Sequence, residues 1–239
     1  MRLAILSDIH GNRTALDAVL ADLRQTAPDL IFHGGDLVGS GSSSAEVVDQ
    51  ICDLGWPGVA GNTDEMLATP SAFEDFAREL PALTQLWATI REISDFERES
   101  LGSKRLAWLR DLPKTQVYGP IALVHASPDS LWKSPGSAAG SEELESVYGS
   151  LGQAIAVYGH IHCPFVRNFP GKLVINTGSV SLSYDGDPRA SYLLLDGSLP
   201  TIRRVEYDVQ REIRALHNCG LPHAEWIAKM LESASPQMP

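Results

Sequence analysis

The chain has 239 residues and a formal net charge of −11, from 30 acidic and 19 basic residues. It contains no run rich in lysine and arginine and no apolar stretch of the ~20 residues that a membrane span requires, so we expect neither a nucleic-acid groove nor a membrane segment. Its three cysteines are widely spaced, which is typical of a reducing compartment. We therefore expect one cytoplasmic domain over residues 1–239, and the sequence leaves its oligomeric state open.

Strands and helices are expected to alternate over the first 60 residues. The apolar run Leu3–Leu6 predicts a buried strand, and Thr14–Arg24 carries apolar residues at helical spacing. Leu30–Phe32 predicts a second strand, residues 47–51 a second helix, and Gly58–Ala60 a third short strand. This βαβαβ order indicates an α/β fold with parallel strand pairing.

Residues 65–112 are helix-rich and charged, with apolar side chains at helical spacing that favour packing over a cofactor-binding role. We expect a helical insertion that lies over one edge of the sheet. The second half is strand-rich, and turns at residues 185–188 and 196–197 indicate antiparallel hairpins before a helical segment over 209–231. The strands expected there are residues 121–124, 155–158, 173–175, 192–195 and 202–207.

Short polar signatures directly follow the predicted strands. The carboxyl ends of strands in open α/β sheets converge on one crevice, so we expect the side chains of these signatures to meet. Carboxylate oxygens together with neutral imidazoles suit borderline divalent cations, and Asp36 is a natural bridge between two of them. The seven candidate ligands are Asp8, His10, Asp36, Asn62, His125, His160 and His162.

Each signature is weak when it is taken alone. Asp8 could cap a helix, His10 could form a local hydrogen bond, and the Gly-Asp pair at Asp36 is an ordinary turn signal. However, four of the seven histidines fall in this set, each at a strand end and in a fixed order with glycines. The combination favours a metal centre with two ions about 3.5–4 Å apart.

The order D-x-H, GD, GN, H and GHxH resembles the calcineurin-like metallophosphoesterase superfamily, especially its compact prokaryotic branch of phosphodiesterases and phosphatases. The resemblance spans nearly the whole chain, from the opening LSDIHGN onwards. It implies a β-sandwich of two sheets flanked by helices. It also implies two metal sites that share one carboxylate: the first formed by Asp8, His10, Asp36 and His162, and the second by Asp36, Asn62, His125 and His160.

The implied activity is hydrolysis of phosphodiester or phosphomonoester bonds in small substrates, nucleotides among them, by a hydroxide that bridges the metals. Manganese is the expected metal, with iron, nickel, cobalt or zinc as alternatives. A protein phosphatase is disfavoured, because Leu37 and Val38 follow the GD pair where those enzymes carry Asp-Arg-Gly. The alternative is a non-catalytic or weakly catalytic metal-binding scaffold of the same fold.

The resemblance also implies residue roles and one departure. Asn62 and Asn12 are expected near the substrate phosphate, although Asn12 is equally suited to capping a helix. The family usually has a histidine after Gly-Asn that protonates the leaving group, but here Thr63 occupies that position.

Thr63 can donate one hydrogen bond but cannot act as a general acid near neutral pH, and loss of a general acid typically costs ~10²–10⁴ in rate for poor leaving groups. Asp64 then becomes either a hydrogen-bonding group or a substitute acid. Three readings remain open: activated leaving groups, a proton from His10 or His33, or weak catalysis. The expected catalytic residues are Asp36, His10, Asn62 and Asp64, and the expected substrate-binding residues are Asn12, Asn62 and Thr63.

Overall fold

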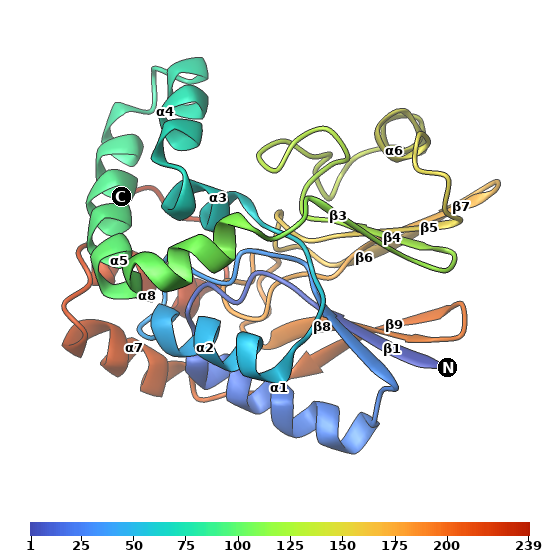
Figure 1. Cartoon of the computed structure of the whole chain (residues 1–239), viewed down its shortest axis with the longest axis horizontal. Helices are drawn as coiled ribbons and strands as arrows, with labels where there is room; N and C mark the ends of the chain where they lie inside the picture. The colour runs from blue at the N-terminus through green and yellow to red at the C-terminus, as the bar shows by residue number, and fades with distance from the viewer.

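Two mixed β-sheets face each other in the computed structural model, which describes all residues, 1–239 (Figure 1). The first sheet has the order β2-β1-β8-β9. Its central strand β1 (Arg2–Leu6) pairs in parallel with β2 (Leu30–His33) and antiparallel with β8 (Ala190–Asp196), which forms a hairpin with β9 (Leu199–Val205).

The second sheet has the order β3-β4-β5-β7-β6. Its three central strands β4 (Ile121–Val124), β5 (Ile155–Tyr158) and β7 (Lys172–Asn176) run in parallel. The edge strands β3 (Thr115–Tyr118) and β6 (Phe165–Phe169) pair with them in antiparallel fashion. The predicted α/β class with two sheets and flanking helices is therefore confirmed.

Alternation along β1 explains how this strand supports two cores at once. Leu3 and Ile5 pack against side chains of the second sheet, whereas Ala4 and Leu6 pack against helices on the other side. Successive side chains of a strand point to opposite faces, so a strand covered on both faces is apolar throughout. Helices α1 (Arg13–Thr26) and α2 (Ser44–Leu54) cover the outer face of the first sheet.

The outer face of the second sheet is covered by α6 (Ser141–Tyr148), whose Leu144 and Tyr148 join the core there. The predicted helical insertion is confirmed as α3 (Asn62–Ala68), α4 (Pro70–Glu79) and α5 (Thr84–Arg110), with a break in α5 at Gly102. Figure 1 shows these helices standing beside the ends of both sheets, next to α7 (Val209–Asn218) and α8 (Ala224–Ser233).

Some expected elements differ from the structure. Gly58–Ala60 is not a strand, because Gly58 forms only a single parallel bridge with His33. The turn at 185–188 joins no hairpin, because the chain there passes from β7 of the second sheet to β8 of the first. The helical segment 209–231 is two helices, α7 (Val209–Asn218) and α8 (Ala224–Ser233). None of the helices has both the length and the apolar character needed to cross a membrane.

Candidate metal centre

The carboxyl ends of strands from both sheets deliver the predicted ligands to one place. Asp8 and His10 follow β1, and Asp36 follows β2 of the first sheet. His125 follows β4 of the second sheet directly, and Asn62 is the first residue of α3. The remaining two ligands, His160 and His162, follow β5. The structure therefore brings together side chains that are up to 154 residues apart in the sequence, between Asp8 and His162.

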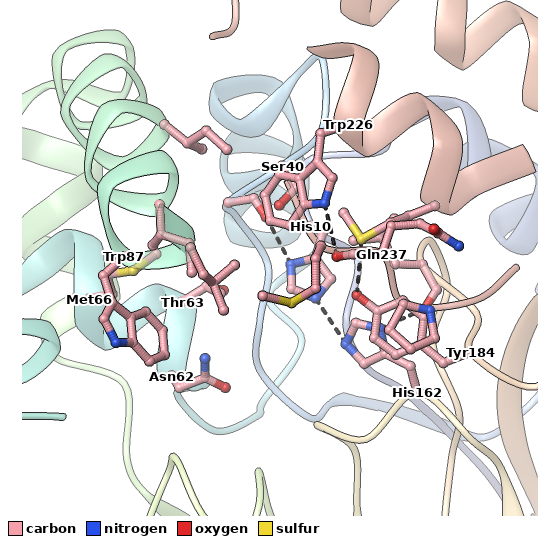
Figure 2. A pocket seen from close by; sticks show the side chains of 18 of the residues that line it. His10, Ser40, Asn62, Thr63, Met66, Trp87, His162, Tyr184, Trp226 and Gln237 are labelled. Atoms are coloured by element: carbon pink, nitrogen blue, oxygen red, sulfur yellow. Dashed lines mark hydrogen bonds between the residues drawn. The ribbon is translucent and has the colours of Figure 1, made fainter. Parts of the chain in front are cut away.

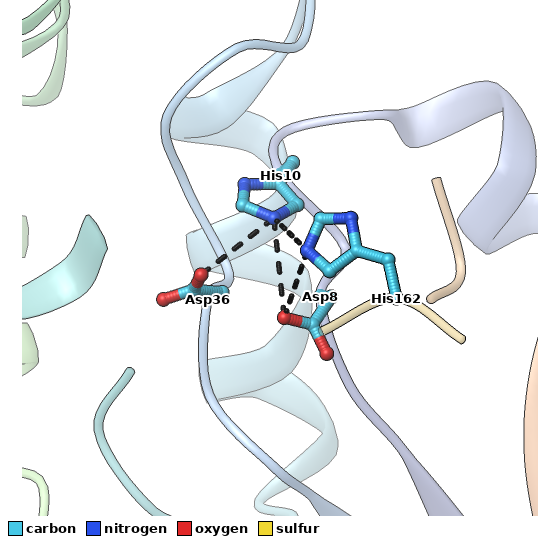
Figure 3. Close-up of side chains that lie close together, drawn as sticks. All are labelled: Asp8, His10, Asp36 and His162. Atoms are coloured by element: carbon cyan, nitrogen blue, oxygen red, sulfur yellow. Dashed lines mark hydrogen bonds and ion pairs between the residues drawn. The ribbon is translucent and has the colours of Figure 1, made fainter. Parts of the chain in front are cut away.

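Four of these side chains form a tight buried group (Figure 3). One ligand atom from each of Asp8, His10, Asp36 and His162 lies within 4.8 Å of the others. His162 Nε2 is 3.2 Å from Asp8 Oδ1, and His10 Nε2 is 3.6 Å from Asp36 Oδ2. Two carboxylates and two imidazoles at these distances form a set that could hold a borderline divalent cation.

Three imidazoles of the centre are oriented by backbone carbonyls. The Nδ1 atoms of His10, His125 and His162 lie 3.0, 2.8 and 2.5 Å from the carbonyl oxygens of Gly39, Gly34 and Leu182. A carbonyl can only accept, so each Nδ1 carries its proton, and in the neutral ring Nε2 presents a lone pair. Metal-binding histidines are commonly oriented by a hydrogen bond of this kind.

The orientation leaves two ring nitrogens facing each other without a proton between them. His10 Nε2 and His162 Nε2 are 3.2 Å apart. Since both rings are protonated at Nδ1, two lone pairs point towards the same point when the rings are neutral. Such a contact is unfavourable unless a cation lies at that point. The donor set therefore fits a metal ion on grounds of hydrogen bonding as well as residue type.

A second group of donor atoms lies on the other side of Asp36. Asn62 Oδ1 is 2.9 Å from His125 Nε2 and 2.8 Å from His160 Nδ1. His125 Nε2 is 3.4 Å from Asp36 Oδ1. The two oxygens of Asp36 thus contact different groups, Oδ2 the first and Oδ1 the second. This is the arrangement expected of a carboxylate that bridges two cations.

The backbone at the centre is strained. Five of the predicted ligands adopt positive φ angles between 48° and 65° although none is a glycine: Asp8, His10, Asp36, His160 and His162. This region costs a residue with a Cβ about 1 kcal/mol or more, and such conformations cluster at functional sites. The strain turns each side chain sharply out of its strand towards the centre.

Glycines in the signatures allow close contact between the loops. A Cβ on Gly61 would lie 2.1 Å from Asp36 Oδ1, and one on Gly159 would lie 2.3 Å from Asp8 Oδ2. Gly35 has φ +85° and would place a Cβ 2.4 Å from the nitrogen of Gly61. Glycine is therefore needed at these three positions for the carboxylates to reach the centre.

The electrostatics of the centre keep both carboxylates ionised. Burial alone would raise the pKa values of Asp8 and Asp36, but His162 and His125, respectively, hold each pKa below its usual range. Burial also opposes protonation of His125, yet Asp36 beside it raises the pKa of this imidazole to about 9. Burial lowers the pKa of His160 to about 4. A buried negative charge of this kind favours a cation in the centre.

Asp64 stabilises the loops that carry the ligands. Its carboxylate accepts hydrogen bonds from the backbone N–H groups of Asp36, Leu37 and Gly61, all at 2.9 Å. Burial and the neighbouring Asp36 raise the pKa of Asp64 to about 7. The side chain is fully buried and does not line the pocket beside the centre. Its contacts correspond to the hydrogen-bonding role, the first of the two predicted alternatives.

Of the two other predicted substrate-binding residues, Thr63 lines the pocket beside the centre and Asn12 does not. Asn12 caps α1, with Oδ1 accepting from Ala15 N at 2.8 Å and Nδ2 donating to Ser181 Oγ at 3.1 Å. The structure therefore shows the capping role for Asn12, which is fully buried. Thr63 lines the pocket, but its hydroxyl donates to the Val38 carbonyl at 2.8 Å.

Glu97 of α5 belongs to the support of the site but was not among the predicted residues. This carboxylate is 2% exposed and accepts hydrogen bonds from the N–H groups of Gly39 and Ser40, both at 2.9 Å. The Gly39 carbonyl in turn orients His10. A signal was present, because Glu97 lies four residues from Ile93 and from Leu101 on the apolar face of the helix. A charged residue in an apolar stripe indicates a buried partner.

A pocket of about 340 Å³ opens beside the first group of ligands (Figure 2). His10, His162, Asn62 and Thr63 are among the residues that line it. His33, by contrast, is fully buried and does not line the pocket, so it has no path to a substrate there.

Comparisons with known proteins agree with this geometry. Residues 1–198 match the model of the calcineurin-like phosphoesterase superfamily domain. An uncharacterized protein of Methanocaldococcus jannaschii is 30% identical over 96% of each chain. A metallophosphoesterase from Sphaerobacter thermophilus superposes with a TM-score of 0.80 at 26% identity, over 98% of this chain and 100% of that one. A hypothetical protein from Pyrococcus horikoshii OT3 superposes with a TM-score of 0.85 at 20% identity, over 99% of both chains.

Proposed function

Because the chain belongs to the calcineurin-like phosphoesterase superfamily, we propose that it hydrolyses phosphodiester or phosphomonoester bonds of small substrates with the help of two divalent cations. The first cation would be held by Asp8, His10, Asp36 and His162, and the second by Asp36, Asn62, His125 and His160. We propose manganese as the metal, with iron, nickel, cobalt or zinc as alternatives, since all suit these ligands.

The observation that carries the proposal is the position of Asp36. Its two oxygens contact two separate groups of ligands, and the backbone N–H of Thr63 donates to Oδ1 at 2.8 Å, which fixes the orientation of the carboxylate. When bound, two cations would supply Lewis-acid activation of a water molecule and neutralise charge on the phosphate oxygens. Asn62 would lie beside the phosphate and hold it in place with its amide group.

The same residues favour substrates with good leaving groups. Thr63 has no titratable proton near neutral pH, and its hydroxyl is already engaged with Val38. Asp64 is surrounded by backbone amides, and His33 is sealed in the core. His10 has no free proton either, because its Nδ1–H donates to the Gly39 carbonyl and its Nε2 would hold the first cation. Among the three readings of the missing histidine, leaving groups that need no proton are therefore the one we propose.

The test is hydrolysis of bis-p-nitrophenyl phosphate and p-nitrophenyl phosphate by metal-free protein reloaded with Mn²⁺. We expect metal-dependent turnover of the wild type and a loss of at least about 100-fold in Asp36→Asn, since one bridging oxygen becomes a neutral amide. Asp53→Asn, an exposed aspartate of α2, is the matched control and should retain full activity. A folded wild type that binds Mn²⁺ but hydrolyses neither ester would favour the scaffold alternative.

A further inference from the structure

The pocket beside the centre has an apolar character that the phosphate chemistry does not require. Three tryptophans line it, Trp87 of α5, Trp132 of the loop after β4, and Trp226 of α8, together with Met66 and Met230. Figure 2 labels Trp87, Trp226 and Met66 among them. No lysine, arginine, aspartate or glutamate is among the lining residues. A volume of about 340 Å³ is within the usual range for small-molecule sites.

The tryptophans present ring surfaces to the pocket and not hydrogen-bond donors. Each indole N–H donates to a protein oxygen: Trp87 to the Leu80 carbonyl at 2.8 Å, Trp132 to Glu65 Oε2 at 2.8 Å, and Trp226 to the Gln237 carbonyl at 2.9 Å. These bonds also hold the rings in place. Fixed aromatic surfaces favour stacking with a flat apolar group.

The absence of charge limits what the pocket can accept. A substrate with further phosphates would place negative charge against apolar rings with no cation to pair with it, and an unpaired charge that loses its water is costly. An uncharged aromatic group pays no such desolvation cost, and its burial removes apolar surface from water. The pocket therefore suits a substrate with one phosphate and one aromatic group.

One wall of the pocket is formed by residues beyond the region that matches the family model. That region ends at residue 198, whereas Trp226, Met230 and the tail residues 236–238 line the pocket. The tail is held on both sides, because Trp226 donates to Gln237 O and Gln85 Nε2 donates to Pro239 O at 2.9 Å. This apolar wall thus lies outside the part of the chain that matches the family model.

We infer that this pocket binds an uncharged aromatic ester group, so that the substrate is an aryl ester of a single phosphate. The inference rests on the proposed function, because it assigns a substrate class to the same metal centre. It agrees with the lack of a proton donor at Thr63, since a phenolate depends on protonation less than an alkoxide does.

The test is calorimetric binding of a phosphonate series to the Mn²⁺-loaded protein: methyl-, benzyl-, 1-naphthylmethyl- and 4-carboxybenzylphosphonate. Binding should tighten by at least about tenfold from methyl to naphthylmethyl, because the aromatic group fills the pocket. The carboxylate should abolish the gain seen with benzyl. Equal binding of methyl and naphthylmethyl, including no measurable binding of either, would overturn the inference.

Variants of pocket residues test whether the aromatic preference arises in this pocket. In Trp226→Ala the ratio of the naphthylmethyl to the methyl affinity should fall to about twofold, and deletion of residues 236–239 should lower it in the same direction if Trp226→Ala fails to fold. Trp56→Ala is the matched control, because Trp56 is also half-buried but does not line this pocket. An unchanged ratio in both pocket variants contradicts the assignment.

Turnover of bis-p-nitrophenyl phosphate is measured in parallel, so the two claims can fail separately. An aromatic preference in binding without turnover supports the pocket assignment and refutes hydrolysis. Turnover without an aromatic preference keeps the hydrolase and overturns the substrate class.

Discussion

Thr63 lies at the side of the pocket nearest the metal centre, with its backbone N–H bound to Asp36 and its hydroxyl bound to Val38. The backbone contact depends on no side chain, so a substitution at this position preserves the support for Asp36. The side chain itself can therefore be exchanged to ask what a proton donor would add.

Thr63→His should raise the hydrolysis rate for esters with poor leaving groups. An imidazole there could protonate the leaving oxygen, and general-acid catalysis contributes ~10²–10⁴, of which we expect about tenfold or more without further optimisation. Phenyl phosphate should gain and p-nitrophenyl phosphate should change little, because p-nitrophenolate needs no proton. The measurement is kcat for both esters, with Thr63→Asn as the control that lacks an acid. Equal gains for both esters, or a gain in Thr63→Asn, would rule out a missing acid.

Residue types and spacing were sufficient to predict which side chains come together, but not all of their roles. The candidate ligands could be picked out because strand ends converge and because four of the seven histidines follow strands in a fixed order with glycines. Asn12 had two roles open, and its second contact, with Ser181, depends on the loop before β8, which lies far away in the sequence. Glu97 was missed because its partners, Gly39 and Ser40, are backbone groups that no side-chain pattern reveals.

Helix α5 holds the loop that orients His10. Glu97 accepts from two successive N–H groups of this loop, and Ser40 there has a φ of 125°, a conformation that needs support. The path from α5 to the centre is thus Glu97, the backbone of Gly39 and His10 Nδ1. The insertion contributes to the centre as well as to the pocket.

Glu97→Gln should weaken metal binding while the fold is retained. The amide nitrogen of glutamine would face a backbone N–H in place of an acceptor, so one of the two bonds is lost and the loop loosens. Groups that orient metal ligands typically contribute 10–100-fold in affinity, which is the loss we expect. Mn²⁺ titration measures it, with exposed Glu99 of the same helix, as Glu99→Gln, for comparison. Equal Mn²⁺ affinities in the two variants would show that Glu97 does not support the orientation of His10.

Strong apolar runs were predictable as strands, and weak ones were not. The central strands β4 and β5 were predicted with their observed bounds because both are buried on two faces. The edge strands β3 and β6 were missed because most of their residues are partly or fully exposed, so their sequences lack an apolar run. The sequence of Gly58–Ala60 is typical of a strand. In the structure this segment is bridged to the sheet only at His33, whose N–H donates to the Pro57 carbonyl, so no strand ladder forms.

At the scale of the whole molecule, the centre lies where the two sheets meet, with ligands from β1 and β2 on one side and from β4 and β5 on the other. Its geometry therefore depends on the packing between the sheets. His33, the last residue of β2, lies on the other, helix-covered face of the first sheet: it is fully buried, neither ring nitrogen has a polar partner, and its ring lies 6.3 Å from that of Trp108 of α5.

Burial of His33 should make the protein sensitive to acid. Burial lowers its pKa from 6.5 to about 4. Between these two pH values the ring is neutral in the folded state but protonated in the unfolded state. The stabilisation is complete above pH 6.5 and is lost as the pH falls towards 4, on the order of 3 kcal/mol at 1.36 kcal/mol per pH unit. Between pH 6.5 and 4, the free energy of unfolding should therefore fall less in His33→Leu than in the wild type.

Urea unfolding at several pH values measures this difference. His217→Leu serves as the control because His217 lies on the surface of α7. If His33→Leu and the wild type lost the same free energy over this range, protonation of the buried ring would not be the cause of acid sensitivity.

The most direct test of the central claim is a titration of the metal-free protein with Mn²⁺ in which bound metal and hydrolysis of bis-p-nitrophenyl phosphate are recorded together. The position of Asp36 between two groups of ligands predicts that binding ends at two ions per chain and that the rate rises mainly with the second. Saturation at one ion with full activity, or two bound ions without turnover, would contradict a dinuclear phosphoesterase.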